Sequence, residues 1–454
     1  MNVVDDEPLV RVVVLDYHGG QMTLDCLGSL VATDWPSERL EIVLVDNGGD
    51  AGLMAEVRAR FPQVVVIEPG ENLGFAAGCN RGIRAPGRFD AVALVNNDAE
   101  VAPGWLRPLV EALQSDARVG AVCPKILFDG QYQELVVEVP DAAPVGGDPR
   151  RLGVRVTAVR LDGVRADERL TTDEGFHAPD TPDAGEEMAR WSGRRGSLRI
   201  RATGGEPVRR VSVRLTAPSR RRVRLEGAGS ALDLIADTTP RWYDVEVTPI
   251  ARDAINNVGS CLFAGGYGGD RGFLELDAGQ YDAPAEVFAW CGGAVLLSNR
   301  YLDEVGLFDE RLFLYYEDTE LSWRGRLSGW CYVYEPASVV WHRHSASSGG
   351  VGSPVFSYYT DRNRLVVLMR HAPNATAARA LAVRARRTAS LIVGQGVRPL
   401  LRGRRPAVGA LRHEARVWWG IARLAPAMLR ERRAVGEPDR LEQLRWETLK
   451  TGMA

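Results

Sequence analysis

The chain of 454 residues contains almost no lysine, since Lys125 and Lys450 are its two lysines and arginine supplies the rest of its 56 basic residues. Acidic residues number 59, so the formal net charge is only -3. A strong overall charge of one sign is therefore missing. This balance excludes a protein that binds nucleic acid through its net charge, and it also excludes an acidic tail protein.

Closely spaced cysteines are missing as well. The six cysteines lie far apart in the sequence and none of them forms a CxxC pair, so we expect no zinc site. Their sequence neighbours are apolar or small, as around Cys123 and Cys291. This pattern predicts buried free thiols in a reducing compartment.

Signals for export or membrane insertion are not found in the sequence. The N-terminus has no cationic start followed by an apolar stretch, which is the pattern of a secretory signal peptide. No apolar run approaches the roughly 20 residues that a membrane-spanning helix needs. We therefore expect a cytoplasmic protein, which at most lies on the cytoplasmic face of the inner membrane.

Strands and helices alternate through residues 9–128. Short apolar runs predict buried parallel strands, and stretches with helical spacing separate them. This alternation predicts an α/β fold: an open, doubly wound, mostly parallel sheet with helices on both faces. Such sheets bind ligands at the carboxyl ends of their strands, where Asp46 and Asn96-Asn97-Asp98 fall. The expected strands cover 9–15, 41–45, 64–67, 91–95 and 119–123, and the expected helices cover 21–32, 53–61, 75–82 and 105–114.

The pattern changes after residue 130. Residues 131–250 contain short alternating runs separated by Gly, Pro and Asp, and helical periodicity is nearly absent. These features predict an all-β sandwich module, inserted because the α/β pattern returns from residue 251. The predicted domain boundaries are 9–130, 131–250, 251–354 and 355–454.

The C-terminal region, residues 355–454, is predicted to be helical and basic. Between residues 362 and 433 the sequence has 17 arginines and two acidic residues. In a helix over 408–430, apolar residues and arginines lie on opposite sides, which is typical of a helix at a membrane interface. Pro426 is expected to kink that helix. The region is predicted either to contact an anionic membrane or to pack on the rest of the chain. The apolar side holds Leu411, Val417, Trp418, Ile421, Leu424 and Met428.

Three positions at the ends of predicted elements carry candidate chemistry. Asp98 follows a buried strand and either binds Mg²⁺ or Mn²⁺, which prefer oxygen ligands, or caps the next turn. Asp318 begins a predicted helix, where the helix dipole favours a carboxylate; it either accepts a proton from a hydroxyl or acts as a plain N-cap. His342 follows a strand and is either a further metal ligand or a structural residue. Arg362 and Asn363 either clamp a pyrophosphate or lie on an exposed helix face.

A glycine-rich segment at residues 72–80 precedes a predicted helix, as phosphate-binding loops do. The segment does not fit GxGxxG, and the chain contains no Walker motif. These two absences exclude a Rossmann dehydrogenase and a P-loop enzyme.

The motifs follow one another in a specific order. In sequence they are Leu15-Asp16-Tyr17-His18-Gly19, Val45-Asp46-Asn47-Gly48, Asn72-Leu73-Gly74-Phe75-Ala76-Ala77-Gly78-Cys79-Asn80, Asn96-Asn97-Asp98, Gly293-Ala294, Gly306-Leu307-Phe308-Asp309-Glu310, Tyr316-Glu317-Asp318, Trp341-His342 and Arg362-Asn363. This set resembles family 2 glycosyltransferases with the GT-A fold. The most similar subgroup is that of bacterial rhamnosyltransferases and galactofuranosyltransferases, and the resemblance covers residues 10–130 and 252–365.

The resemblance implies an inverting, metal-dependent transfer of a sugar from a nucleotide diphosphate to an acceptor hydroxyl, in the synthesis of a cell-wall or surface polysaccharide. The implied donor is dTDP-rhamnose or UDP-galactofuranose, and the implied acceptor is a glycan or a lipid-linked glycan. Asp46 would contact the nucleotide base, Asp98 and His342 would bind Mg²⁺ or Mn²⁺, and Asp318 would be the general base with Glu317 beside it. The other implied donor-binding residues are Asn72, Gly74, Asn80, Asn96, Asn97, Asp98, Arg362 and Asn363. The implied acceptor-binding residues are Trp290, Gly292, Gly293 and Tyr316.

Several positions depart from the family pattern. Asn96 occupies the first DXD position, so metal binding would depend more on Asp98 and His342. His18 replaces the usual Asn of the first loop, and Gly49 replaces the usual Ser. The QxxRW-like motif and membrane helices of processive synthases are missing, which favours transfer of a single residue.

Two other functions fit the same sequence. One is a non-catalytic carbohydrate-binding scaffold with a degenerate transferase domain, which the Asn96 departure allows. The other is transfer to a polyprenyl phosphate, which would not need Asp318. The insert either binds carbohydrate or serves as a rigid spacer or oligomer contact. Within it, Trp191 and Trp242 either stack on a sugar ring or pack in the core.

Overall fold

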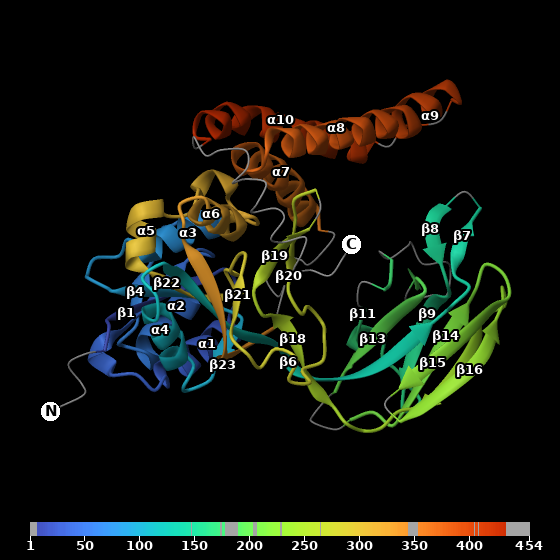
Figure 1. Ribbon diagram of the computed structural model, residues 1–454, viewed down its shortest axis with the longest axis horizontal. Coiled ribbons are helices and arrows are strands. Elements are labelled where there is room, and N and C mark those ends of the chain that lie inside the picture. The colour runs from blue at the N-terminus through green and yellow to red at the C-terminus, as the bar shows by residue number, and fades with distance from the viewer. Residues whose placement is uncertain are drawn as a thin grey trace. The chain divides into compact units, whose positions relative to one another are not determined.

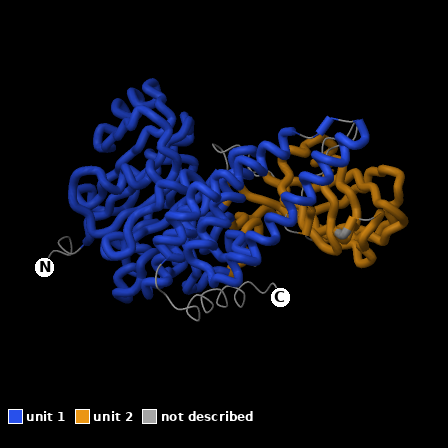
Figure 2. The backbone as a smooth tube through the Cα atoms, turned by 90° about the horizontal axis from the view of Figure 1, so that it is seen from above, with its two compact units in different colours: residues 1–127, 256–272, 281–454 blue, residues 128–255, 273–280 orange. Residues whose placement is uncertain are grey.

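The chain divides into two compact units, which Figure 2 distinguishes by colour. Unit 1 comprises residues 1–127, 256–272 and 281–454, and unit 2 comprises residues 128–255 and 273–280. The division into four segments made from the sequence stays a prediction. The computed structural model describes residues 7–146, 148–172, 175–177, 189–202, 207–227, 229–263, 265–343, 353–403, 405–406 and 408–432.

The core of unit 1 is a sheet whose central strands are parallel (Figure 1). Strand β1 (Val10–Asp16) pairs in parallel with β2 (Leu40–Asp46) on one side and with β4 (Ala91–Asn96) on the other. Strand β3 (Val65–Ile67) extends the sheet in parallel beyond β2, and β22 (Ala294–Ser298) pairs antiparallel with β4. The central strands are mostly apolar because helices cover both faces of such a sheet. The predicted α/β fold with a parallel core is confirmed.

The helices of the first half of unit 1 lie close to their predicted positions. Each predicted helix or strand before residue 115 agrees with the structure to within two residues at either end. Helix α3 packs on β1 and β2, and α4 packs on β22. A short strand, β5 (Ala99–Val101), was not predicted. The helices are α1 (Gln21–Val31), α2 (Ala51–Arg60), α3 (Gly74–Ile83) and α4 (Leu106–Gln114), with a 3-10 turn η2 (Ser37–Arg39).

Strand β6 (Val119–Glu138) supplies residues to both units. Its predicted end at residue 123 is wrong, because buried apolar residues continue through Phe128 and return at Leu135 and Val137. The second part of β6 pairs antiparallel with β13 and with β15 in unit 2. One continuous strand therefore serves as the entry to the insert.

Unit 2 consists of antiparallel strands around one apolar core. Side chains of β6, β13 and β15 pack against side chains of β9, β14 and β17, which belong to another sheet. Two antiparallel sheets with a shared core form a β-sandwich. The strands are β7 (Ala143–Val145), β8 (Asp148–Leu152), β9 (Arg155–Leu161), β10 (Val164–Arg165), β11 (Leu170–Thr172), β12 (Arg190–Trp191), β13 (Arg195–Arg201), β14 (Arg210–Thr216), β15 (Arg221–Gly227), β16 (Ser230–Ala236) and β17 (Arg241–Glu246), with the turn η3 (Asp167–Arg169).

The chain returns to unit 1 along β18 (Arg252–Asn257). All six cysteines are free; Cys26, Cys79 and Cys123 are buried as predicted, whereas the other three are partly exposed. The later elements of unit 1 complete the sheet and place a helix next to it. They are β19 (Ser260–Phe263), β20 (Tyr267–Asp270), β21 (Ala285–Val287), α5 (Asn299–Val305), η4 (Glu310–Leu312), α6 (Glu317–Arg326) and β23 (Cys331–His342).

The C-terminal helices pack on one another. Helix α10 (Val408–Arg430) lies along α7 (Pro354–His371), and its apolar residues Val417, Ile421 and Met428 are buried there. The sequence left open whether this face contacts a membrane or packs on the rest of the chain, and these three residues pack on α7. Helix α10 continues through Pro426. Among the described helices, none is both long and apolar enough to cross a bilayer. The remaining elements are α8 (Asn374–Leu391), η5 (Ile392–Val397) and α9 (Arg398–Leu401).

Candidate active site

Asp98 and His342 lie side by side although they are far apart in the sequence. Strand β23 pairs antiparallel with β5 so that His342 faces Ala99, the residue after Asp98. Imidazole Nε2 of His342 consequently lies 3.0 Å from Oδ1 of Asp98. Both side chains are buried. The structure therefore brings together the two predicted metal ligands.

His342 has a polar partner at each ring nitrogen. Its Nδ1 lies 3.0 Å from Oδ1 of Asn256, which can accept a hydrogen bond from that nitrogen, and its Nε2 lies 3.0 Å from Oδ1 of Asp98 and 3.3 Å from the amide nitrogen of Asn96. With the proton on Nδ1, Nε2 is an electron-pair donor beside the carboxylate of Asp98. Two electron-pair donors that converge in this way form a nitrogen and oxygen ligand set. Within the described residues, no three His, Cys, Asp or Glu side chains form a metal-binding group.

Asp318 lies in the first turn of α6. One of its carboxylate oxygens, Oδ2, accepts the Gly292 N–H (3.2 Å), and Oδ1 accepts the Thr319 N–H (2.6 Å). Loss of solvation raises the pKa of Asp318, although these hydrogen bonds oppose the increase. The neighbouring Glu317 is buried, and burial together with the charge of Asp318 raises its pKa well above the ordinary range. Asp318, the predicted general base, is thus a partly buried carboxylate with a raised pKa, and its role as a base stays a prediction.

The backbone of Gly292 and Gly293 joins the two parts of the site. Gly292 donates its N–H to Asp318, and the carbonyl of Gly293 accepts the N–H of Asn96 (2.9 Å). A Cβ atom on Gly293 would lie 3.7 Å from side-chain atoms of both Asn96 and His342. Asp318 and the Asp98–His342 pair therefore both lie next to the segment Gly292-Gly293. A side chain on either glycine would occupy space beside these groups.

Trp290, which precedes these glycines, was predicted to bind acceptor. Its side chain is fully buried and packs edge-on against Phe308, with ring centroids 5.8 Å apart. A side chain with no exposed surface cannot contact an acceptor, so this prediction is corrected to a core role. The contact with Asp318 comes instead from the backbone N–H of Gly292, two residues later.

The loop before α6 has a strained backbone. Phe313, Tyr315 and Tyr316 all have positive φ angles of 65 to 69°, a region that side chains other than glycine rarely adopt. Asn363 on α7 donates to three carbonyls of the segment 312–315, over distances of 2.7 to 3.0 Å. Arg362 donates to the carbonyl of Leu312 over 2.7 Å. Asn363 is fully buried, so its predicted nucleotide contact is corrected to support of this loop.

Tyr316, predicted to bind acceptor, connects the loop to the β19–β20 hairpin. Its hydroxyl accepts the N–H of Gly268 (3.0 Å) and donates to the carbonyl of Gly266 (3.1 Å). The contact of Tyr316 with acceptor stays a prediction, as does the contact of Arg362 with pyrophosphate. Both side chains already have partners that fix the loop leading into α6.

The predicted nucleotide side of the site is organised by short-range hydrogen bonds. Asp46 accepts the backbone N–H of Gly49 over 2.7 Å, which closes the turn after β2. Asn47 donates to Asn72 over 2.9 Å and so joins this turn to the loop before α3. Gly74 has a φ of 76°, and a Cβ atom there would lie 2.5 Å from the ring of Phe313. Only glycine therefore fits at the start of α3, where the chain meets the loop before α6.

Two asparagines predicted to bind nucleotide have partners inside the protein. Asn80 has no exposed surface; it donates to the carbonyl of Phe308 (3.0 Å) and accepts the N–H of the same residue (3.1 Å). Its predicted nucleotide contact is corrected to a structural role. Asn97 donates to the carboxylate of Asp16 (3.0 Å) and to the hydroxyl of Thr23 (3.1 Å). These bonds hold the strand end that carries Asp98, and contact of Asn97 with nucleotide stays a prediction.

Asp270, at the end of β20, is a site residue that sequence reasoning missed. Loss of solvation, together with the charge of Asp318, raises its pKa to about 6, while the hydrogen bond from Asn257 and the charge of His342 act in the opposite direction. Asn257 donates to its carboxylate over 2.6 Å. Asn256, the partner of His342, was also missed. Each is a polar residue near the end of a strand, but neither strand was predicted and neither residue belongs to a motif.

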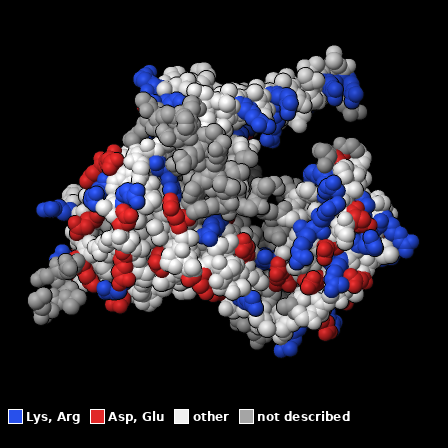
Figure 3. Space-filling model, in the orientation of Figure 1, with Lys and Arg blue, Asp and Glu red and all other residues white. Residues whose placement is uncertain are grey.

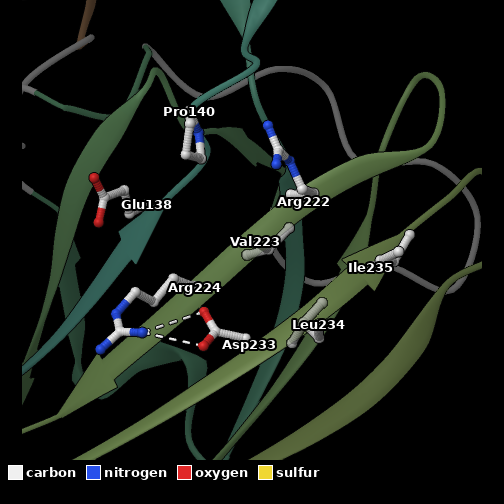
Figure 4. A pocket seen from close by; sticks show the side chains of 8 residues that line it. All are labelled: Glu138, Pro140, Arg222, Val223, Arg224, Asp233, Leu234 and Ile235. Carbon is white, nitrogen blue, oxygen red and sulfur yellow. Dashed lines mark hydrogen bonds and ion pairs between the residues drawn. The ribbon is translucent and has the colours of Figure 1, made fainter.

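A groove of about 500 Å³ lies in unit 2 and contains none of these residues (Figure 4). Arg224 and Asp233 form an ion pair of 3.1 Å across it. No aromatic side chain lines it, so it lacks the ring on which a sugar would stack. Elsewhere in unit 2, the guanidinium of Arg160 covers the ring of Trp242 at 4.1 Å. Carbohydrate binding by the insert therefore stays a prediction, and we locate the candidate active site in unit 1.

Comparisons with known proteins point to one family for the first part of the site. Residues 12–135 match the model of glycosyl transferase family 2. The N-acetylglucosaminyl-diphospho-decaprenol L-rhamnosyltransferase of Mycobacterium tuberculosis is 43% identical over 129 residues, which is 26% of this chain and 41% of that protein. An uncharacterized protein of Mycobacterium bovis is 36% identical over 140 residues, which is 30% of this chain and 48% of that protein. The chain thus spans less than half the length of these relatives.

Two solved structures share parts of the architecture. GalNAc-T7, determined with UDP, GalNAc and Mn²⁺, has a TM-score of 0.45 and 14% identity over 82% of this chain and 49% of that chain. A mannosyltransferase from Pyrobaculum calidifontis, in complex with GDP-Man and Mn²⁺, has a TM-score of 0.37 and 14% identity over 93% of this chain and 88% of that chain.

Proposed function

We propose that this chain, which carries a glycosyl transferase family 2 domain at residues 12–135, transfers one sugar from a nucleotide diphosphate donor to an acceptor hydroxyl with inversion. The observation that carries the proposal is the arrangement around Gly292 and Gly293. A carboxylate with a raised pKa contacts one glycine, and the Asp98–His342 pair lies beside the other. Direct displacement needs these two kinds of group on either side of the reacting carbon.

The donor atoms of Asp98 and His342 fit a divalent cation that takes its remaining ligands from a diphosphate. Mg²⁺ and Mn²⁺ favour oxygen ligands, and a neutral imidazole is a common additional ligand. A cation bound there would neutralise negative charge on the departing nucleoside diphosphate. Asn256 orients the imidazole from behind, so that Nε2 rather than Nδ1 points to Asp98.

In this proposal Asp318 removes the proton from the acceptor hydroxyl. The acceptor oxygen forms its bond to the anomeric carbon while the bond from that carbon to the diphosphate oxygen breaks, and the proton ends on the carboxylate. A general base is most effective when its pKa lies near the working pH, and loss of solvation moves the pKa of Asp318 in that direction. Attack from the face opposite the leaving group produces inversion.

The name of the Mycobacterium tuberculosis relative supports a choice of substrates. That protein is named for transfer of L-rhamnose to a decaprenol-linked N-acetylglucosaminyl diphosphate. We propose dTDP-rhamnose as the donor, with UDP-galactofuranose as the alternative, and a lipid-linked glycan as the acceptor. The reaction would then belong to cell-wall or surface polysaccharide synthesis, at the cytoplasmic face of the membrane.

Calorimetric titration of nucleotides tests the donor site. UDP, dTDP and GDP would each be titrated into the full chain with Mn²⁺ and with EDTA. We expect one nucleotide to bind, to need the metal, and to lose most of its affinity in Asp98→Ala. Asp303→Ala, an exposed carboxylate on α5, is the matched control and should bind as the wild type does.

Two results of the nucleotide titration would contradict parts of the proposal. If the folded wild-type chain binds none of the three nucleotides, the transferase proposal fails and the carbohydrate-binding scaffold gains support. Binding that is equally tight in EDTA and in Asp98→Ala would remove the metal from the proposal.

A further inference from the structure

The connection between α8 and α10 has exposed apolar side chains. We define the arm tip as the described residues 392–403, 405, 406 and 408, which include η5 and α9. Leu401 is 82% exposed and Leu400 is 62% exposed. The full set of exposed large apolar side chains in the arm tip is Ile392, Val393, Val397, Leu400, Leu401 and Val408.

This clustering is unusual for a protein surface. Large apolar side chains that are exposed singly are common and need no explanation, whereas a contiguous group marks a binding surface. Elsewhere in the described chain, exposed residues such as Val164 and Ile250 are separated along the sequence. The arm tip therefore differs from the rest of the described surface because its exposed large apolar side chains lie close together in the sequence.

The arm tip and the residues next to it in the sequence contain several arginines, and this stretch of the sequence has no acidic residue. No Asp or Glu occurs between Asp361 and Glu414. On the face shown in Figure 3, blue and white atoms cover the helices labelled α8 to α10 in Figure 1. Among the described residues, no carboxylate forms an ion pair with the exposed arginines near the tip. These are Arg386, Arg387, Arg398, Arg402, Arg405 and Arg412.

The arm tip is distinct from the apolar face of α10. That face is covered by α7, and within it Gly420 allows close approach, since a Cβ atom there would lie 2.7 Å from Arg362. The residues at the tip are instead exposed. The amphipathic pattern in the sequence therefore reflects packing within unit 1, whereas the arm tip has a separate apolar surface.

We propose that the arm tip docks on an anionic membrane, with its apolar side chains in the interfacial layer and the surrounding arginines on lipid phosphates. Exposed apolar residues and exposed basic residues in one segment match the two layers of a bilayer surface, acyl chains below and anionic headgroups above. Arginine stems can extend along the apolar layer while their charged ends stay with the headgroups. A second copy of the chain fits less well, because it would bring two arginine-rich tips together.

Vesicle sedimentation with the full chain tests this proposal. The probes are phosphatidylcholine vesicles with and without phosphatidylglycerol, at low and high salt. We expect binding to the anionic vesicles alone, weakened by salt. The double variant L400D/L401D should bind about tenfold more weakly or worse, because it replaces two apolar side chains by charges.

Matched variants separate the contribution of the apolar side chains to vesicle binding from that of the arginines. Val164→Asp changes an exposed valine of unit 2 and should leave vesicle binding unchanged. Arg398→Gln and Arg402→Gln should each weaken binding about fivefold, since a basic residue near an anionic surface contributes about 1 kcal/mol. Thermal melting would confirm that each variant is folded. Nucleotide titration should be unaffected in all of them, so that failure here is distinguishable from failure of the donor site.

Three results would overturn the proposal. The first is a folded wild-type chain that ignores anionic vesicles. The second is a L400D/L401D variant that binds them as tightly as the wild type does. The third is a wild-type chain that self-associates in solution without lipid and becomes monomeric in L400D/L401D, since the tip would then be an interface between copies.

Discussion

Asp318 and Glu320, two of the three carboxylates of helix α6, lie two residues apart in opposite electrostatic environments. Asp318 accepts backbone N–H groups, and loss of solvation raises its pKa. Glu320 is fully buried but contacts Arg324, Arg370 and His371, and its pKa is held well below the ordinary range despite the burial. Burial without a cation makes a carboxylate a base, whereas burial with cations makes it a structural anchor.

The first prediction concerns the reactive side of α6. Asp318→Asn should lower kcat by about 10² to 10⁴, because the variant retains the size of the side chain and loses the base. Nucleotide affinity should change little, since the change is on the acceptor side. Steady-state kinetics with Asp303→Asn as the control would measure the effect. Wild-type kcat in a folded Asp318→Asn protein would contradict the comparison.

The second prediction concerns the structural side. Glu320→Gln should destabilise the fold by about 3–5 kcal/mol, because it leaves Arg324 buried without its anion and removes one of the three anionic partners of Arg370. At a temperature where the variant stays folded, kcat should remain near the wild-type value. Chemical denaturation of this variant beside Glu304→Gln, an exposed glutamate on α5, would give the difference. A loss of kcat without a loss of stability would mean that Glu320 belongs to the reactive side.

The third prediction is the pH dependence of the same cluster. Burial lowers the pKa of His371 to about 4 from its ordinary 6.5, so the unfolded chain takes up this proton first as the pH falls. The pKa of Glu320 is also lowered, so this carboxylate decreases the free energy of unfolding further once the pH falls below the ordinary glutamate pKa of 4.5. The free energy of unfolding should therefore decrease from pH 6.5 toward pH 4, by up to about 1.4 kcal/mol per pH unit from His371.

Activity should also decrease toward acid pH, but for a different reason, because Asp318 must be deprotonated to act as a base. Unfolding curves and initial rates measured across the same pH range separate the two effects. His371→Gln should flatten the stability curve between pH 6.5 and pH 4 and leave the acid limb of the rate profile in place. A rate profile that follows the stability curve in both proteins would contradict the separation.

The smallest expected effect concerns the loop that precedes α6. Asn363→Ala removes the donor that holds three carbonyls of the strained segment 312–315, and Asp318 follows this segment. We expect a decrease of about tenfold in kcat with nucleotide affinity unchanged, because a small displacement of a base slows proton transfer. Nucleotide titration beside kinetics would reveal this split. Equal losses in affinity and in kcat would instead indicate a general loss of folding.

The sequence predicts the parallel core well because each strand is an apolar run that ends at a polar residue. Asp46 and Asn96 mark two such ends, and both strands lie within one residue of the prediction. The pairing of Asp98 with His342 was reached through the family resemblance, since nothing local links residues so far apart in sequence. Asp270 and Asn256 were missed because their role depends on the folding of β18 and β20 against the site.

Periodicity shows that a helix has an apolar face, but it does not reveal what covers the face. For this reason the sequence left the apolar side of α10 open between a membrane and the rest of the chain, and in the structure α7 covers it. The three corrected side chains, Asn80, Trp290 and Asn363, have the same explanation. Each is a residue type that binds ligands when exposed, and each is fully buried here.

The anomeric configuration of the product tests the account most directly. The wild-type chain would be incubated with dTDP-rhamnose or UDP-galactofuranose, Mn²⁺ and a lipid-linked N-acetylglucosaminyl diphosphate, and the new linkage would be read by proton NMR. A single displacement by Asp318 predicts a configuration opposite to that of the donor. A product that retains the donor's configuration would contradict the account, because it would require a covalent intermediate or a different reaction face.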